Sequence, residues 1–239
     1  MCTIDEERGI PEPIVRAVVC FVERIGPFFP AGSLRMGGGT ILQARWGHRR
    51  STDADLFCDP RTYVETVREH GEAMEREIRN VADDEEEGEP FVDLVATFSR
   101  VGDTEVTILP AAPLLDESSG RHVPGTTVRT ESTGDILAGK LVHRLGGAGV
   151  VEPRDLFDLV AAERHDPTAL RRAVGLLTDL QVQEISATLL MLPPRWELTT
   201  DKPVLSISGD HARVVPADVV EVLRRSAQAS GESKAGPAP

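Results

Sequence analysis

The spacing of apolar residues changes at about residue 132, and this change constrains the fold more than any other feature of the sequence. Before it, segments with helical periodicity are mixed with short segments that have the pattern of strands. After it, apolar residues recur almost wholly at helical spacing. The sequence therefore predicts an α/β (α+β) N-terminal half followed by a C-terminal helical bundle.

The N-terminal half is predicted to contain both helices and strands. The helices cover residues 11–25, 40–46 and 62–80, and the strands cover residues 53–57, 91–98 and 104–109. The turn residues Gly102 and Asp103 join the last two strands, which indicates a hairpin. The C-terminal half is predicted to be helical over residues 132–145, 154–164, 168–180, 183–191 and 216–226.

These elements divide the chain into four expected segments. They are an α/β core over residues 1–111, a connecting segment over 112–131, a helical domain over 132–227 and a tail over 228–239. The tail is rich in small residues, which is typical of disorder. An acidic run at residues 83–89 is typical of a solvated loop, and the alternative is a docking site for a basic partner.

Composition excludes several classes of protein. The chain of 239 residues is 40% hydrophobic, so it can build a sizeable core. It has no run of about 18 apolar residues, and its acidic N-terminus lacks the pattern of a signal peptide. We therefore expect a cytoplasmic protein with no membrane partner. The formal net charge of −13 repels nucleic acid on average, so any such contact must be local.

Two aspartates, Asp53 and Asp55, lie on one predicted strand with a single alanine between them. Side chains alternate along a strand, so both carboxylates point the same way with their Cα atoms about 6.5–7 Å apart. A divalent hard cation relieves their repulsion, and magnesium held by one or two carboxylates plus substrate phosphates is a common arrangement. The alternative is an ordinary pair of surface carboxylates.

Glycines 37–39 come directly before Thr40, at the start of a predicted helix. Glycine lets the main chain approach a ligand, and free amides at a helix N-terminus favour phosphate. The hydroxyl of Thr40 is a further donor, and Arg49 and Arg50 could neutralise a triphosphate. The alternatives are a flexible glycine turn and an exposed basic loop around the two arginines.

This segment resembles the signature of the nucleotidyltransferase superfamily, and more narrowly its AbiEii/AbiGii toxin branch. The matching residues are Gly38, Gly39, Thr40, Leu42, Arg49, Ser51, Asp53, Asp55 and Leu56. A second match lies downstream, at Lys140 and in the run from Arg154 to Leu159. The resemblance spans about residues 30–165 and implies a polymerase-β-like fold with a mixed sheet, followed by the helical bundle.

The resemblance implies transfer of a nucleoside monophosphate from a nucleoside triphosphate to an acceptor hydroxyl. Asp53 and Asp55 would hold magnesium or, in its place, manganese. Asp53, Asp55, Lys140 and Asp155 would be the catalytic residues, with Asp155 orienting either the nucleotide or Lys140. The nucleotide would be bound by Gly38, Gly39, Thr40, Arg49, Ser51 and Lys140.

The downstream residues also have a purely local interpretation. Lys140 and Arg144 are four residues apart, so they place two positive charges on one face of a helix. Asp155 and Asp158 lie near the start of the next helix, where the helix dipole favours acidic residues. In this interpretation Arg154 pairs with one of the two aspartates.

One departure from the superfamily concerns the third carboxylate that many of its members carry on a later strand. Here that position is Thr107, and Glu105 shares its face two residues earlier. Either Glu105 is the third metal ligand, or the site works with two carboxylates, or the enzyme is impaired. Asp93 on the preceding strand is a weaker substitute.

The toxin branch also implies an acceptor and a biological role. The acceptor would be RNA, in particular the 3′ end of transfer RNA, and the result would be growth arrest in defence against phage (abortive infection). A cognate antitoxin would be the protein partner. Two alternatives remain: an enzyme that modifies a small molecule such as an antibiotic, and a catalytically silent fold that only binds.

Overall fold

A computed structural model describes residues 6–80, 89–115, 118–198, 203–209 and 212–234. The chain divides into two compact units. The sheet unit comprises Met1–Gly47, Ser51–Pro113 and Ser118–Ser132, and the helical unit comprises His48–Arg50, Leu114–Glu117 and Thr133–Pro239. The acidic run lies largely outside the described residues, which resume at Glu89.

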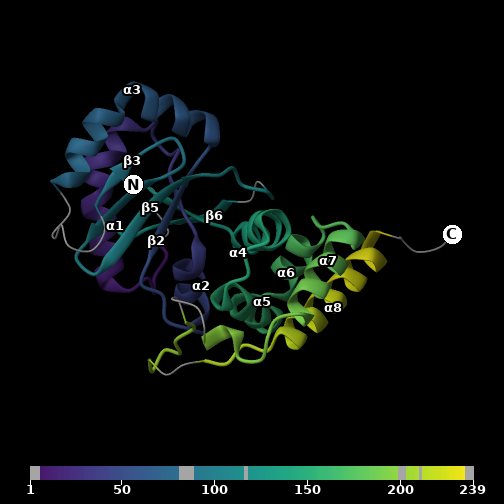
Figure 1. Cartoon of the computed structure of the whole chain (residues 1–239). Coiled ribbons are helices and arrows are strands. Elements are labelled where there is room, and N and C mark those ends of the chain that lie inside the picture. The colour runs from purple at the N-terminus through teal and green to yellow at the C-terminus, as the bar shows by residue number, and fades with distance from the viewer. Residues whose placement is uncertain (1–5, 81–88, 116–117, 199–202, 210–211, 235–239) are drawn as a thin grey trace. The chain divides into compact units, whose positions relative to one another are not determined.

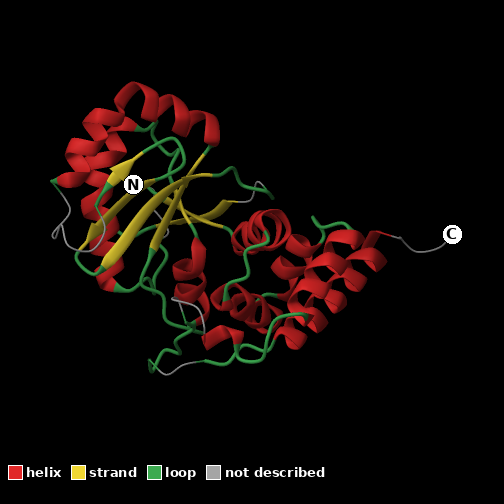
Figure 2. Cartoon of the chain, in the orientation of Figure 1, coloured by secondary structure: helices red, strands yellow, loops and turns green. Residues whose placement is uncertain are grey.

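The sheet unit is built on a seven-stranded mixed sheet with the order β3-β4-β5-β2-β1-β7-β6 (Figure 2). Its strands are β1 (Arg35–Met36), β2 (Ala54–Cys58), β3 (Phe91–Val92), β4 (Thr97–Val101), β5 (Thr104–Pro110), β6 (Ser118–His122) and β7 (Arg129–Glu131). The pairs β2–β5 and β1–β7 are parallel, and the other neighbours are antiparallel. The expected α/β fold with a mixed sheet is confirmed.

Helices α1 (Glu12–Ile25) and α3 (Pro60–Arg79) cover one face of this sheet (Figure 1). The strand residues that face them form the core, because every second side chain of a half-buried strand points inward. On β2 these are Ala54, Leu56 and Cys58, and on β5 they are Val106 and Ile108. The remaining helix, α2 (Gly38–Trp46), lies between β1 and β2 in the chain and is followed by Gly47 in the left-handed conformation.

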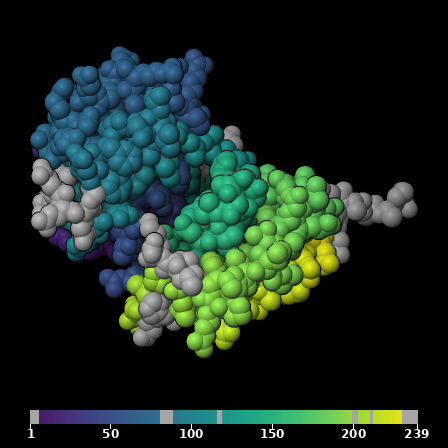
Figure 3. Space-filling model, in the orientation of Figure 1, coloured from purple at the N-terminus to yellow at the C-terminus, as the bar shows by residue number. Residues whose placement is uncertain are grey.

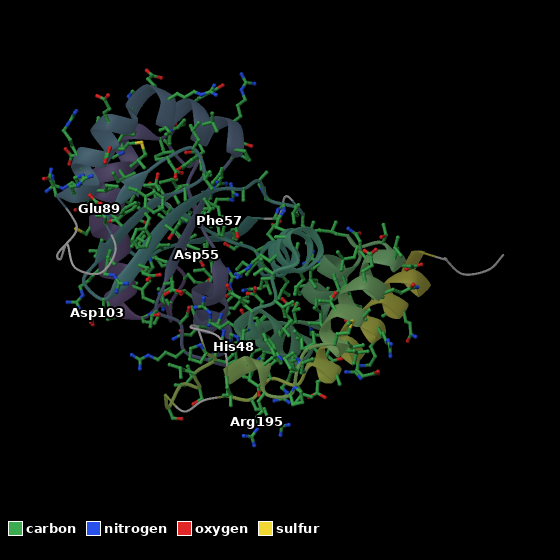
Figure 4. All side chains as sticks on the ribbon, viewed as in Figure 1. His48, Asp55, Phe57, Glu89, Asp103 and Arg195 are labelled. Atoms are coloured by element: carbon green, nitrogen blue, oxygen red, sulfur yellow. The ribbon has the colours of Figure 1, made fainter. Side chains whose placement is uncertain are left out.

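The opposite face of the sheet, which we call the site face, carries the side chains between these core positions. Asp55 and Phe57 of β2, labelled in Figure 4, belong to it and are partly buried. Thr107 of β5 is the direct register partner of Asp55, and Phe98 of β4 is the partner of Thr107.

The helical unit packs its helices around a second core. Its elements are α4 (Thr133–Ala138), a π-helix (Gly139–Ala148), α5 (Pro153–His165), α6 (Pro167–Val174), α7 (Asp179–Leu190), a 3₁₀ turn (Trp196–Leu198) and α8 (Pro216–Lys234). Helix α8 contacts α5, α6 and α7, and its yellow atoms lie beside the green atoms of α7 in Figure 3. The helical C-terminal half is therefore confirmed.

Several element boundaries differ from the sequence prediction for local reasons. The strand predicted over 91–98 is interrupted, because the Asp93 carboxylate accepts hydrogen bonds from the main-chain N–H groups of Val95 and Ala96 and closes a turn. The helix predicted over 168–180 ends at Val174, and Thr178 starts the next helix with a capping box to Gln181.

The predicted connecting segment, 112–131, instead supplies β6 and β7. These strands are short and polar, so they lack the alternating pattern that marks a strand in sequence. Helix α8 continues to Lys234, so the tail expected to be disordered from residue 228 is helical up to that point. Residues 235–239 lie outside the described part of the chain.

Candidate nucleotidyltransferase site

The glycine turn and the Asp-x-Asp segment come together in the sheet unit. The strand begins at Ala54, so Asp53, predicted to lie on it, comes one residue before it. The main-chain N–H of Gly37 donates to the main-chain oxygen of Asp55 over 3.0 Å. Gly38 has a φ of +70°, and a Cβ atom there would overlap Oδ2 of Asp55. Only glycine allows this main chain to lie so close to the carboxylate. The predicted phosphate-binding turn is therefore in direct contact with a predicted metal ligand.

Thr40 and Ser51 tie the start of α2 to the loop before β2. The hydroxyl of Thr40 donates to the main-chain oxygen of Asp53 over 2.5 Å and lies 2.9 Å from Oγ of Ser51. The main-chain N–H of Ser51 donates to Oε1 of Gln43 over 2.5 Å. Both hydroxyl residues are buried. This arrangement fixes the position of Asp53 relative to the glycine turn, a task that sequence reasoning did not assign to them.

The two aspartates carry the oxygen atoms that a hard divalent cation prefers as ligands. Both are partly buried, and the Asp53 carboxylate accepts a hydrogen bond from the Thr52 hydroxyl over 3.0 Å. Magnesium is usually bound through one or two carboxylates and retains other oxygen ligands. Among the described residues, no group of three or more His, Cys, Asp or Glu side chains is placed to hold a metal ion.

The structure gives the third-carboxylate candidates different surroundings. Thr107 occupies the position directly beside Asp55 on the neighbouring strand. Glu105, two residues earlier, forms an ion pair of 2.9 Å with Arg100. Asp93 caps the turn between β3 and β4.

A further acidic residue, Glu131 of β7, was missed by sequence reasoning. A Cβ atom at Gly37 would overlap its Oε2, and Arg35 lies 3.5 Å from its Oε1. The side chain is only 10% exposed. Glu131 comes next to the glycine turn because β1 and β7 pair in parallel, and nothing local in the sequence indicates that pairing.

The second set of predicted residues forms a buried cluster in the helical unit, which we call the ion cluster: Arg49, Lys140, Asp155 and Asp158. Arg49 binds Asp158 in a bidentate manner, with Nε to Oδ1 at 2.6 Å and Nη2 to Oδ2 at 2.9 Å. Lys140 Nζ lies 2.5 Å from Oδ1 of Asp155 and 3.1 Å from Oδ2 of Asp158. The cluster therefore pairs two cations with two carboxylates.

These pairings control the ionisation of the cluster. Burial alone would raise the pKa of Asp158, but the charges of Lys140 and Arg49 outweigh it and hold that pKa well below its ordinary value. Burial would lower the pKa of Lys140, but Asp155 and Asp158 outweigh it and raise that pKa. The pKa of Arg49 is raised in the same way by Asp158, against the effect of burial. Asp158 and Lys140 are thus both charged at neutral pH.

Residues around the ion cluster extend it. His48 Nε2 lies 2.7 Å from Oδ1 of Asp158, and the His48 ring stacks on Phe157 with 5.9 Å between centroids. The side chains of His48 and Arg49 are almost fully buried, so the alternative of an exposed basic loop is wrong for these two residues. Arg50 is exposed. Arg49, which was expected to bind the nucleotide, belongs to the helical unit.

The prediction that Lys140 and Arg144 share one face is confirmed, because both contact Asp155. Arg144 Nε lies 3.1 Å from Oδ2 of that carboxylate, and Nη2 of the same arginine lies 2.5 Å from Oε1 of Glu152. Arg154 Nη2 lies 3.5 Å from Oε2 of Glu152.

Comparison with known proteins gives one family and two structures. The model of the family described as "Nucleotidyl transferase AbiEii toxin, Type IV TA system" matches residues 21–200. A crystal structure of a candidate nucleotidyltransferase from H. pylori is 14% identical, with a TM-score of 0.48, and covers 93% of this chain and 95% of its own. The structure of JHP933 from Helicobacter pylori is 15% identical, with a TM-score of 0.47, and covers 94% and 93%. No curated protein sequence matches.

In the described part of the chain, no helix is both long enough and apolar enough to span a membrane.

Proposed function

We propose, because the chain belongs to the AbiEii family of nucleotidyltransferase toxins of type IV toxin–antitoxin systems, that it transfers a nucleoside monophosphate from a nucleoside triphosphate to a hydroxyl group of RNA. Membership makes the chain a nucleotidyltransferase and implies a cognate antitoxin. The RNA acceptor, in particular the 3′ end of transfer RNA, and the dependence on magnesium are our proposals. The protein would act in the cytoplasm, as expected from its sequence.

The observation that carries the proposal is the contact between Gly38 and Asp55. A phosphate chain bound by the amides at the start of α2 would lie next to the carboxylate that holds the metal. Magnesium, or manganese, bound by Asp53 and Asp55 would supply charge stabilisation for the phosphoryl oxygens. Gly38 and Gly39 would bind the β- and γ-phosphates, and Thr40 and Ser51 would hold this turn against Asp53.

For the ion cluster we propose a division of roles. Lys140 would neutralise the triphosphate as a point charge, and its raised pKa keeps it protonated at neutral pH. Asp155, 2.5 Å away, would orient Lys140, which is one of the two roles expected for it. Arg49 would act as a positioning residue through Asp158 rather than as a direct ligand of the nucleotide.

The test is transfer of label from each α-labelled nucleoside triphosphate to total transfer RNA, with and without magnesium. The variants Asp53→Asn and Asp55→Asn should lose about 100-fold or more of the activity, because each removes a charge that acts on the transferring phosphate. Glu105→Gln is the matched control: it changes a carboxylate on the same face that pairs with Arg100. We expect it to retain activity, and a loss as large as that of Asp55→Asn would make Glu105 the third ligand.

Two results would overturn the RNA proposal. Label on an aminoglycoside-type hydroxyl compound, with none on RNA, would assign a small-molecule acceptor. No label on any acceptor from a folded protein, with every nucleotide, would favour the silent binding module instead.

A further inference from the structure

A single row of side chains crosses the site face and ends in two phenylalanines. Phe91 of β3 is the register partner of Phe98 on β4, Phe98 is the partner of Thr107 on β5, and Thr107 is the partner of Asp55 on β2. Partners on neighbouring strands point to the same face, and the strands are about 4.8 Å apart. Phe98 therefore lies about 10 Å from Asp55 along the row, and Phe91 about 14 Å.

The two rings form a stacked pair at the edge of the sheet. Their centroids are 5.7 Å apart, and the angle between the ring planes is 20°. The large apolar side chain of Phe91 is 41% exposed. Thr97, the neighbour of Phe98, points to the other face, where it lies 2.9 Å from the hydroxyl oxygen of Tyr63 on α3. The aromatic pair is thus separate from the core under α1 and α3.

The geometry of phosphoryl transfer indicates from which side of Asp55 the acceptor approaches. The attacking and leaving oxygens lie roughly in line across the reacting phosphorus. In the proposed function the glycine turn holds the phosphates that leave, and this turn borders β2 on the β1 side, where Gly37 bonds to Asp55. The acceptor must therefore approach Asp55 from the opposite side of β2. On that side the sheet continues through β5 to β4 and β3.

We propose that Phe91 and Phe98 stack against an unpaired base at the acceptor end of the RNA. Aromatic side chains on an open sheet surface are a common way to hold unstacked bases, and stacking tolerates any base. A base within two or three strand spacings of Asp55 belongs to the nucleotides nearest the reacting hydroxyl. The inference rests on the proposed function and narrows its substrate class to RNA with a single-stranded end, as opposed to a blunt duplex.

The test is a binding measurement that needs no turnover. Two short RNAs with a 5′ fluorescent label would be compared by fluorescence anisotropy, one complete and one lacking the bases of its last two nucleotides. Phe91→Leu and Phe98→Leu keep an apolar side chain but remove the ring. Each should weaken binding of the complete RNA by about 5- to 100-fold and leave binding of the base-free RNA unchanged.

Two control variants isolate the ring. Phe91→Tyr retains an aromatic surface at the same exposed position and should bind like the wild type. Val95→Ala removes an apolar group that is 73% exposed in the neighbouring turn, outside the row, and should also bind like the wild type. The thermal unfolding midpoint of every variant would show that the fold is kept.

The outcomes separate this inference from the proposed function. If the wild type labels RNA but the leucine variants bind both RNAs as tightly as it does, the stacking site is wrong and the proposed function stands. Equal weakening for the base-free RNA, or a loss of nucleotide affinity instead, would also overturn it. If base-dependent binding through the rings is found without any transfer, the stacking site stands and the proposed function fails.

Discussion

At the scale of single residues, the site is defined by how closely main chain and carboxylate approach each other. Gly38 combines a left-handed conformation with contact to the Asp55 carboxylate. Gly32 has a similar φ of +76°, but a Cβ atom there would meet nothing within 4 Å. Substitutions at Gly38 and Gly32 therefore separate the free-energy cost of the left-handed conformation from the effect of overlap with Asp55.

We predict that Gly38→Ala abolishes transfer, whereas Gly32→Ala retains it. Gly32→Ala should lower the free energy of unfolding by about 1–2 kcal/mol, the usual cost of a left-handed non-glycine residue. Gly38→Ala should lower it further, because its Cβ atom would also overlap Oδ2 of Asp55. Only Gly38→Ala should displace the Asp55 carboxylate. Urea unfolding and initial rates of the labelling reaction would measure the two effects. Equal activity in both variants would mean that the contact with Asp55 has no part in catalysis.

The Asp-x-Asp strand and the glycine turn were predictable because each is a local pattern with a chemical reason. The surroundings of Arg49 were not, since its partner Asp158 lies 109 residues away in sequence. A basic stretch in sequence has the same appearance whether it is solvated or paired. The position of Glu131 could not be predicted for the same reason, because it lies beside the glycine turn only through the pairing of β7 with β1.

At the scale of elements, the segment that carries Lys140 is unusual because it is a ten-residue π-helix, Gly139–Ala148. π-Helical segments are rare in proteins, and those that do occur are frequently found at functional sites. A Cβ atom at Gly147 would lie 2.9 Å from the main-chain oxygen of Val142, five residues earlier. Glycine at this position thus allows the wider turn. The sequence predicted a helix here, but hydrophobic spacing does not separate the two helix types.

We predict opposite effects for two glycine substitutions in this helix. Gly147→Ala should destabilise the protein, because its Cβ forces the main chain of the last π turn to shift. Gly139→Ala meets nothing within 4 Å and should stabilise by about 0.5–1 kcal/mol, since alanine loses less backbone entropy. Denaturant unfolding of both variants would test this, and stabilisation by both would contradict the π geometry.

At the scale of the whole molecule, the ion cluster sets how stability depends on pH. The lowered pKa of Asp158 contributes stability that is present above the unfolded value, about 3.9, and is lost as pH falls toward the folded value. The raised pKa of Lys140 contributes stability that is present below about 10.4 and is lost as pH rises through the folded value. The cluster is therefore fully effective between these limits.

We predict a urea midpoint that is constant from about pH 5 to 9 and falls on both sides. Asp158→Asn should lower the stability at pH 7 by about 3–5 kcal/mol, because it leaves buried cations with too few partners. It should also weaken the acid dependence. Glu65→Gln, which breaks an exposed pair with Arg61, should leave the midpoint unchanged. If the stability of Asp158→Asn falls as steeply at low pH as that of the wild type, groups other than Asp158 cause the acid dependence.

The assignment of His48–Arg50 to the helical unit has a consequence for how such genes can recombine. Arg49 and its partner Asp158 are encoded far apart, with most of the sheet unit between them. A crossover anywhere in that interval gives a hybrid whose arginine and aspartate come from different parents. Such a hybrid keeps the buried ion pair only where both parents carry an arginine and an aspartate at these two positions, so the C-terminal half can be exchanged without loss only between parents that share the pair.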